Sequence, residues 1–159
     1  MKRQAVRLGL GIIGVVRLGP EQLAPAIWAY QETIPACEPV GGVVNHPSGA
    51  LAMCGIEKAY SMGRDSAGAA SRWYFGDNPS PLHAHRFDSQ EQLRLSNDQL
   101  IEQGIMIGGD ADSVCRGIAR WEHAGVDTLR LRLGAGNTTP EQVMRGLDIL
   151  GDKVIPTFK

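Results

Sequence analysis

The chain has 159 residues and a mass of 17.1 kDa, enough for one domain with a hydrophobic core. Its 16 basic and 17 acidic residues nearly cancel and its aromatic residues are scattered, which excludes an electrostatic site for nucleic acid or an anionic membrane. The three cysteines show no CxxC or Cys/His spacing, so we expect no disulfide framework, no metal site and a reduced, cytoplasmic setting.

The amino-terminal segment also contains the pattern of a secretory signal, with basic residues, an apolar run and Ala24–Ala26 as a cleavage site. Arg7 interrupts the apolar region, and Arg17 and Glu21 make the cleavage region unusually polar. We therefore favour a cytoplasmic protein and keep secretion as the alternative. The apolar run, Leu8–Val16, is too short to cross a bilayer.

Leu8–Val16 is rich in β-branched residues and predicts a strand that is buried on both faces. Gly19 and Pro20 then begin a helix, which Pro25 should kink or delay and which Pro35 ends. The spacing of its apolar residues predicts one buried stripe, made of Leu23, Ile27, Tyr30 and Ile34.

The middle of the chain is less regular. Val43–Asn45 opens an extended segment, which residues 46–49 interrupt. The sequence leaves open whether Ala50–Ile56 continues this segment. Lys58–Tyr74 suits a helix of small residues. We interpret residues 77–103 as an insertion that consists of a loop and a polar surface helix. The packing positions predicted for the small-residue helix are Ala59, Met62, Ala69, Ala70 and Trp73.

The last third is the clearest. A short apolar segment at Ile105–Ile107 precedes Asp110, which caps a helix that Gly125 ends. A strand then begins at Thr128, and a glycine-rich loop leads to a final helix capped by Thr139. The predicted buried positions of the two helices are Val114, Ile118 and Trp121, and then Val143, Leu147, Leu150 and Val154.

Strands and helices thus alternate, which predicts an α/β fold with a parallel sheet of about three or four strands. Such a sheet is either an open layered fold or an arc of a larger barrel, and periodicity alone does not choose between them.

Several segments resemble the carboxyl-terminal half of bacterial luciferase-like flavin-dependent monooxygenases. The similarity is ordered over nearly the whole chain, so residues 1–159 form one luciferase-like domain. The segments that carry it are Ile107–Val114, Trp121–Asp127, Leu129–Gly136 and the VIPTF ending of Val154–Phe158, together with Ala5–Ile12, Leu18–Leu23 and Glu57–Phe75.

The resemblance implies about half of a (β/α)8 TIM barrel, which when complete needs about 250 residues. It also implies reduced FMN or F420 as the cofactor and a small organic substrate. The chain departs from the family where Asp110–Ala111 replaces a Thr-Pro turn and where Thr139–Glu141 replaces a Pro-His-Glu sequence. In the family, the phosphate grip lies before the segment that matches Ala5, so its positions are not in this sequence.

Functional residues of such barrels lie on loops after the carboxyl ends of strands. That rule indicates Gly134 and Gly136 as cofactor-binding residues. It also indicates the following substrate-lining residues: Arg17, Asn45, His46 and Asn137. Asn45 and His46 are candidates only if a strand ends at this point of the chain. Each of these residues also has a purely structural explanation. We favour that explanation for Arg17, as a solvated charge, and for His46, as a turn residue. The two glycines serve a tight turn equally well. No catalytic residue is evident, because no nucleophile or metal motif is present.

Two hypotheses follow. In the first, the chain is a flavin-dependent oxidoreductase or monooxygenase, which is inactive alone if it is truncated. In the second, it is a non-catalytic half-barrel or a small α/β binding module. A half-barrel leaves two sheet edges and an apolar interior uncovered, so we expect a homo-oligomer or a separate amino-terminal half as its partner.

Overall fold

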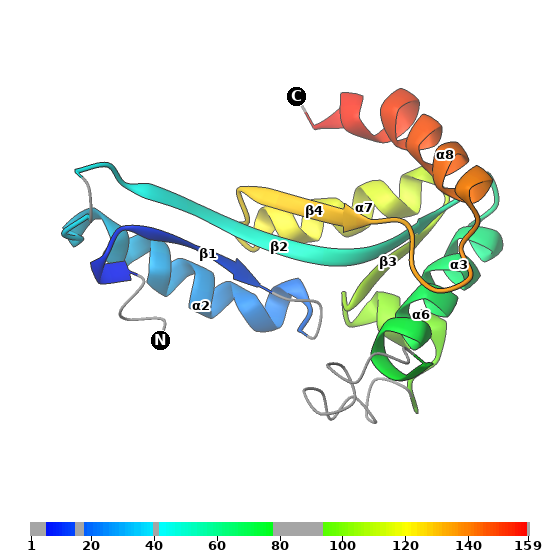
Figure 1. Ribbon diagram of the computed structural model, residues 1–159, viewed down its shortest axis with the longest axis horizontal. Coiled ribbons are helices and arrows are strands. Elements are labelled where there is room, and N and C mark those ends of the chain that lie inside the picture. Colours follow the sequence, from blue (N-terminus) through cyan, green and yellow to red (C-terminus); the bar gives the residue numbers. More distant parts are fainter. Residues whose placement is uncertain (1–5, 15–17, 40–41, 78–93, 159) are drawn as a thin grey trace.

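A computed structural model describes residues 6–14, 18–39, 42–77 and 94–158. Within these residues, strands and helices alternate along the chain (Figure 1). The elements are β1 (Leu10–Gly14), α2 (Pro20–Thr33), the short turn η1 (Ile34–Ala36), β2 (Asn45–Ile56), α3 (Tyr60–Arg72), the π-helical turn η2 (Trp73–Asp77), α6 (Asn97–Glu102), β3 (Met106–Gly109), α7 (Ala111–His123), β4 (Thr128–Arg132), α8 (Pro140–Ile149), and the turns η3 (Leu150–Val154) and η4 (Ile155–Thr157).

The long strand β2 organises the sheet, because it pairs in parallel with each of the other three strands. Gly49 and Ala50 pair with both β1 and β4, so those two strands lie on opposite edges of β2. Met53 pairs with both β3 and β4, which places β3 on the same edge as β1. The predicted parallel α/β sheet is therefore confirmed and is open, but β4 pairs with β2 and not with its predecessor β3 (Figure 1).

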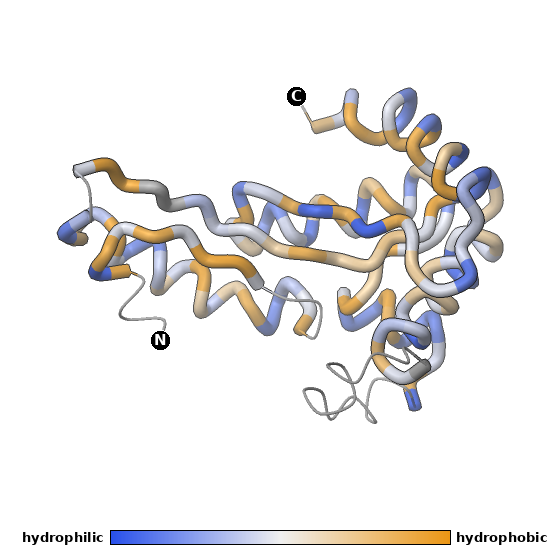
Figure 2. Tube along the Cα trace, in the orientation of Figure 1, coloured by the Kyte–Doolittle hydropathy of each residue, from blue (hydrophilic) through white to orange (hydrophobic). Residues whose placement is uncertain are grey.

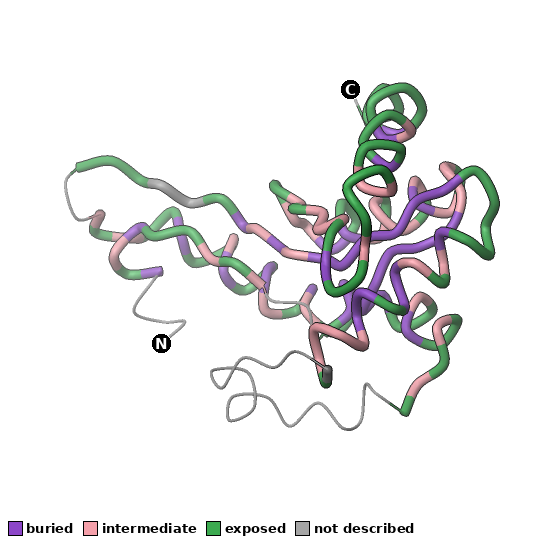
Figure 3. The backbone as a smooth tube through the Cα atoms, turned by 45° about the vertical axis from the view of Figure 1, so that its right-hand side comes forward, coloured by how far each residue is buried: buried purple, intermediate pink, exposed green. Residues whose placement is uncertain are grey.

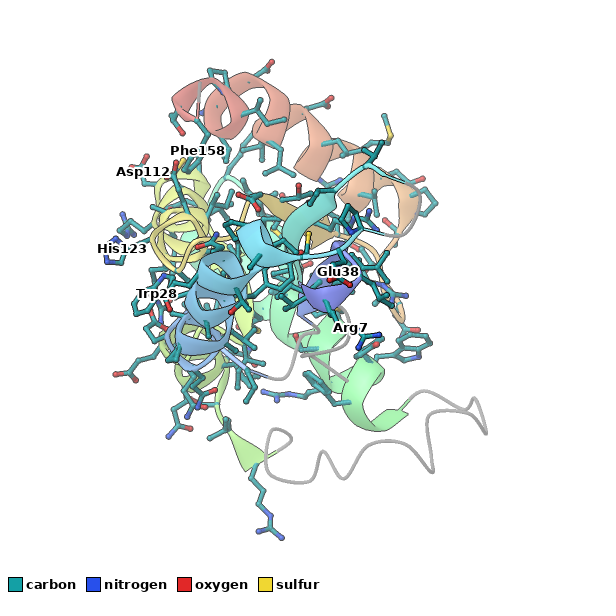
Figure 4. All side chains as sticks on the ribbon, turned by 90° about the vertical axis from the view of Figure 1, so that its left-hand side faces the viewer. Arg7, Trp28, Glu38, Asp112, His123 and Phe158 are labelled. Carbon is teal, nitrogen blue, oxygen red and sulfur yellow. The ribbon has the colours of Figure 1, made fainter. Side chains whose placement is uncertain are left out.

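Both faces of β2 are covered. Alternate residues of a strand point to opposite faces, and Ala50, Ala52 and Cys54 share a core with α7 and η3. Met53, which points the other way, packs with α3 and α6. Figure 4 shows Trp28 of α2 and His123 of α7 on the same side of the sheet. The expectation of an uncovered apolar interior is therefore wrong for β2, because helices lie on both of its faces.

β1 differs from the prediction that it is buried on both faces. Leu10 is 47% exposed and Ile13 is 61% exposed, whereas Ile12 packs with Tyr30 of α2. The reason is topological, since α2 covers one face of β1 and no described element covers the other. Figure 3 shows the same contrast, with burial concentrated along the middle and end of β2 and exposed residues along β1.

The predicted stripe of α2 is confirmed, since Ile27, Tyr30 and Ile34 are buried and Leu23 packs partly buried against the core. The helix begins at Pro20 and continues through Pro25, so this proline does not delay its start. The predicted caps are also confirmed: Asp110 and Thr139 accept hydrogen bonds from Ser113 and Gln142 backbone N–H groups, and Gly125 ends α7 with a φ of 87°.

The packing faces of α3 and α8 differ from the predictions. In α3, Ala59, Met62 and Ala69 are exposed. The predicted positions Ala70 and Trp73 do pack in the core, Ala70 buried and Trp73 partly buried. The other buried positions are Gly63, Ala67, Gly68 and Ser71, because this helix approaches β2 and β3 so closely that only small residues fit. In α8, Leu147 is 46% exposed, and the neighbouring Gly146 faces the sheet in its place.

The predicted insertion at residues 77–103 falls largely outside the described residues. Its described part contains α6, which is shorter than the helix predicted for residues 89–103. The Ser96 side chain caps α6, and the buried Leu100 packs this helix against the small residues of α3.

The three thiols should differ sharply in reactivity. Cys54 is 1% exposed and burial raises its pKa to about 12, so almost no thiolate forms at pH 8. Cys37 and Cys115 are partly exposed. We expect Ellman's reagent to modify two cysteines of the folded protein and the third only after unfolding. The variant Cys54→Ala should keep both reactive thiols; reaction of all three thiols at one rate in the native protein would contradict this expectation.

Candidate functional site

The carboxyl ends of β2 and β3 form the mouth of a crevice with a volume of about 930 Å³. The helix after β2 packs on one face of the sheet and the helix after β3 packs on the other, so the chain leaves these neighbouring strand ends in opposite directions. In open α/β sheets this is where ligands bind. The described residues that line the crevice are Glu57, Lys58 and Met62 after β2, Asp110, Ala111 and Asp112 after β3, and Arg145, Asp148, Ile149, Asp152 and Lys153 of the carboxyl-terminal helical segment.

Glu57 sits at the base of this crevice. Its backbone N–H donates to the carbonyl of Gly109 at 3.1 Å, which extends the β2–β3 pairing by one residue. Its carboxylate is 8% exposed and accepts a hydrogen bond from Arg145 Nη2 at 3.1 Å, while the Arg145 side chain is 49% exposed. A buried carboxylate requires such a partner. The ion pair therefore ties α8 to the end of β2 across the crevice.

The crevice carries an excess of negative charge, since five carboxylates line it together with three cations. The first turn of α7 would be the natural place for an anion, but the Asp110 carboxylate already accepts the Ser113 N–H there at 2.9 Å. Hydrogen bonding from Ser113 also lowers the pKa of Asp110, which keeps this carboxylate charged. The residues of the crevice therefore do not fit the phosphate of FMN or F420. Its volume and its apolar patches at Met62, Ala111 and Ile149 are compatible with a flat ring or a small organic molecule.

The sequence-predicted substrate residues do not meet in this crevice. Arg17 lies outside the described residues. Asn45 and His46 open β2 and do not follow it, so they belong to the amino end of the strand, opposite to the crevice. They were predicted as functional residues on the condition that a strand ends at Asn45. That condition is not met, because the strand continues to Ile56.

Gly134, Gly136 and Asn137 lie in the loop between β4 and α8, all exposed, and none of them lines the crevice. Gly136 has a φ of 62°, and a Cβ there would come within 2.7 Å of the Trp73 ring. A tight turn packed on Trp73 explains this glycine. The ring of Tyr74, the residue after Trp73, covers a charged side chain of β4. The guanidinium of Arg132 lies 5.3 Å from the centre of this ring.

The residues that line the crevice were missed by sequence reasoning. Had the end of β2 been placed at Ile56, the rule that functional residues follow strand ends would have indicated Glu57 and Lys58. Asp110 was identified, but only as a helix cap. The contribution of Arg145 had no sequence signal, because it depends on how α8 folds back over the sheet.

The described part of the chain contains neither a candidate metal site nor a candidate membrane-spanning helix. No group of three or more His, Cys, Asp or Glu side chains in residues 6–14, 18–39, 42–77 and 94–158 could hold a metal ion. Among the same residues, no helix combines the length and hydrophobicity that a bilayer crossing requires.

No protein-family model matches the sequence, and no curated protein matches it. Solved structures do. Monooxygenase RslO1 from Streptomyces bottropensis has a TM-score of 0.75 at 18% identity, with 99% of this chain and 45% of that chain covered. An F420-dependent secondary alcohol dehydrogenase, solved with an F420–acetone adduct, has a TM-score of 0.63 at 22% identity, with 99% and 46% covered.

The coenzyme F420-dependent tetrahydromethanopterin reductase from Methanopyrus kandleri has a TM-score of 0.62 at 19% identity, with 100% of this chain and 48% of that chain covered. This chain thus spans less than half the length of each of these proteins, and identities below one quarter bear on the fold alone. The similarity runs from one end of this chain to the other. The chain therefore has the fold of about half of a luciferase-like barrel chain, with an α/β arrangement and an open parallel sheet.

Proposed function

We propose that this chain belongs to a flavin- or F420-dependent oxidoreductase that acts on a small organic substrate. The observation that carries the proposal is the fold correspondence over 99% or more of the chain with a monooxygenase and two F420-dependent enzymes. The crevice at the ends of β2 and β3 supports it, because this is where parallel α/β folds place their ligands.

In this proposal the crevice holds the substrate or the ring of the cofactor, and this chain supplies no site for the cofactor phosphate. The flavin supplies the redox chemistry when bound, and the protein contributes binding, orientation and exclusion of water. Glu57 and Arg145 hold the wall of the crevice in place, and the excess carboxylates repel a phosphate.

The acid excess also favours a second candidate, a non-catalytic half-barrel or small α/β binding module. A chain that retains the fold but has no phosphate site in its crevice would bind small uncharged or cationic molecules without catalysis. The two candidates differ in whether the purified chain binds a flavin.

Fluorescence titrations with riboflavin and FMN test the proposal. These ligands share one ring system, and FMN adds a phosphate of charge about −2 at neutral pH. We expect riboflavin to bind about tenfold more tightly than FMN in low salt, with a smaller difference in high salt because screening weakens the repulsion. Asp112→Asn should strengthen FMN binding, whereas the exposed Glu32→Gln on α2, which removes the same charge far from the crevice, should not.

Each outcome is informative. If neither flavin binds, the flavin-dependent form of the proposal fails for this chain, and the F420-dependent form and the binding module remain. If FMN binds more tightly than riboflavin, a phosphate site exists and the placement of the ring in this crevice is wrong.

A further inference from the structure

The carboxyl-terminal helical segment exposes four large apolar side chains to solvent. Met144 is 58% exposed, Leu147 46%, Ile155 62% and Phe158 37%, while Leu150 and Val154 of the same segment are buried. The segment is therefore hydrophobic on two sides, and Figure 2 shows orange residues along its length. A helix with this pattern normally has a partner on each side. We call Met144, Leu147, Ile155 and Phe158 the apolar stripe.

Acidic side chains border the stripe. Glu141, Asp148 and Asp152 are exposed, and they are spaced seven and four residues apart, which places them in one row of the segment. Arg145 lies in the same row but is paired with Glu57, and the exposed Lys153 follows Asp152, so the row keeps a net negative charge. None of the ion pairs found in the described residues involves these three carboxylates. The stripe thus has a negative border.

A groove between α2 and α7 has the opposite character. It has a volume of about 560 Å³, and its floor is apolar, formed by Ala24, Pro25, Ala119 and Ala124 with the half-exposed ring of Trp28. Arg116, Arg120 and His123 follow one row of α7 along its rim. Arg120 is paired with Glu21 at 2.8 Å, whereas Arg116 binds only the Ser113 hydroxyl among the contacts described. Figure 4 shows Trp28 and His123 projecting from α2 and α7 on the same side of the molecule.

We infer that the apolar stripe of one copy of this chain docks into the α2–α7 groove of a second copy. Charge complementarity selects this occupant, because a stripe with an acidic border meets a groove with a basic rim. The mode is an amphipathic helix in a groove. The contact is heterologous, since each copy presents two different surfaces, and it therefore produces a ring or a chain of copies. This inference does not depend on the proposed redox function.

The test uses two single variants of the full chain, Trp28→Glu in the groove and Leu147→Glu in the stripe. Both side chains are about half exposed, so neither change disturbs the core. In sedimentation experiments we expect the mass of the wild type to rise with concentration above that of a dimer. Each variant alone should stay monomeric. An equimolar mixture should form a 1:1 dimer and stop there, because one intact stripe and one intact groove remain.

A matched control is Val43→Glu, which adds the same charge at a side chain that is 75% exposed but belongs to neither surface, and which should associate like the wild type. Arg116→Glu should weaken association at least tenfold in low salt, and less in high salt. A wild type that remains monomeric at the highest concentration measured, or a variant mixture that remains monomeric, would overturn the inference. Loss of association in Leu147→Glu but not in Trp28→Glu would also overturn it, because stripes would then pair with each other.

Discussion

Gly63→Ala is expected to lower the free energy of unfolding by about 3 kcal/mol or more, the upper end of the usual cost of overpacking a core. A Cβ at Gly63 would lie 2.7 Å from the carbonyl carbon of Gly109 and closer still to its oxygen. Both groups are backbone. Gly63 is held by its helix, and Gly109 is held by β2 through the Glu57 N–H. Neither can move without separating α3 from β3.

The control is Gly151→Ala, a change of the same chemistry at an open position. A Cβ there meets nothing within 4 Å. Alanine restricts the unfolded chain more than glycine does, so we expect a gain of about 0.5 kcal/mol. Urea denaturation followed by circular dichroism measures both variants. Equal unfolding midpoints for Gly63→Ala and the wild type would show that α3 does not pack on β3 at this distance.

Asp127→Ala is expected to cost about 2–3 kcal/mol, because it removes a charged acceptor and leaves the buried Ser48 N–H without a partner, while the Ser48 hydroxyl keeps the Gly125 carbonyl as its acceptor. Ser48 is 1% exposed, and its N–H and hydroxyl lie 2.8 and 2.7 Å from Asp127 Oδ2. In return the Asp127 N–H donates to the Ser48 carbonyl at 2.9 Å. These reciprocal bonds fix the start of β4 against β2 and thereby set the register of the pair.

Ser48→Ala separates the two parts of this interaction. It removes the hydroxyl but keeps the bond between the Ser48 N–H and the carboxylate, so we expect a loss of about 1 kcal/mol. Asp127→Asn, which retains an acceptor oxygen, should fall between the two other variants. The measurement is again urea denaturation at neutral pH. If Ser48→Ala costs as much as Asp127→Ala, the backbone N–H bond does not contribute to stability.

Sequence reasoning located most helices, because their signals are local. Caps such as Asp110 and Thr139 depend only on the next three residues, and the stripe of α2 depends only on its own spacing. The parallel α/β class also followed from alternation. These features could be predicted because no distant part of the chain is needed to define them.

The errors share a cause, which is that burial depends on distant neighbours. β1 is as apolar as a central strand, but it lies at an edge of the sheet, and only the pairing pattern reveals this. Leu147 continues the apolar spacing of α8, yet Gly146 takes the place against Leu133 because the helix must approach β4 closely. The crevice combines three separate stretches of chain, so its charge balance could not be predicted from any one of them.

The role of β2 as the common neighbour has a consequence for how the chain folds. No two of the other described strands pair with each other, so each strand joins the sheet only through β2. The pairing with β4 joins residues about 79 positions apart, as for Ser48 and Asp127. Pairings of such long range are slow to form. During synthesis, one edge of β2 therefore stays without its β4 partner until Thr128–Arg132 has left the ribosome, and an unpaired strand edge of this kind is prone to aggregation.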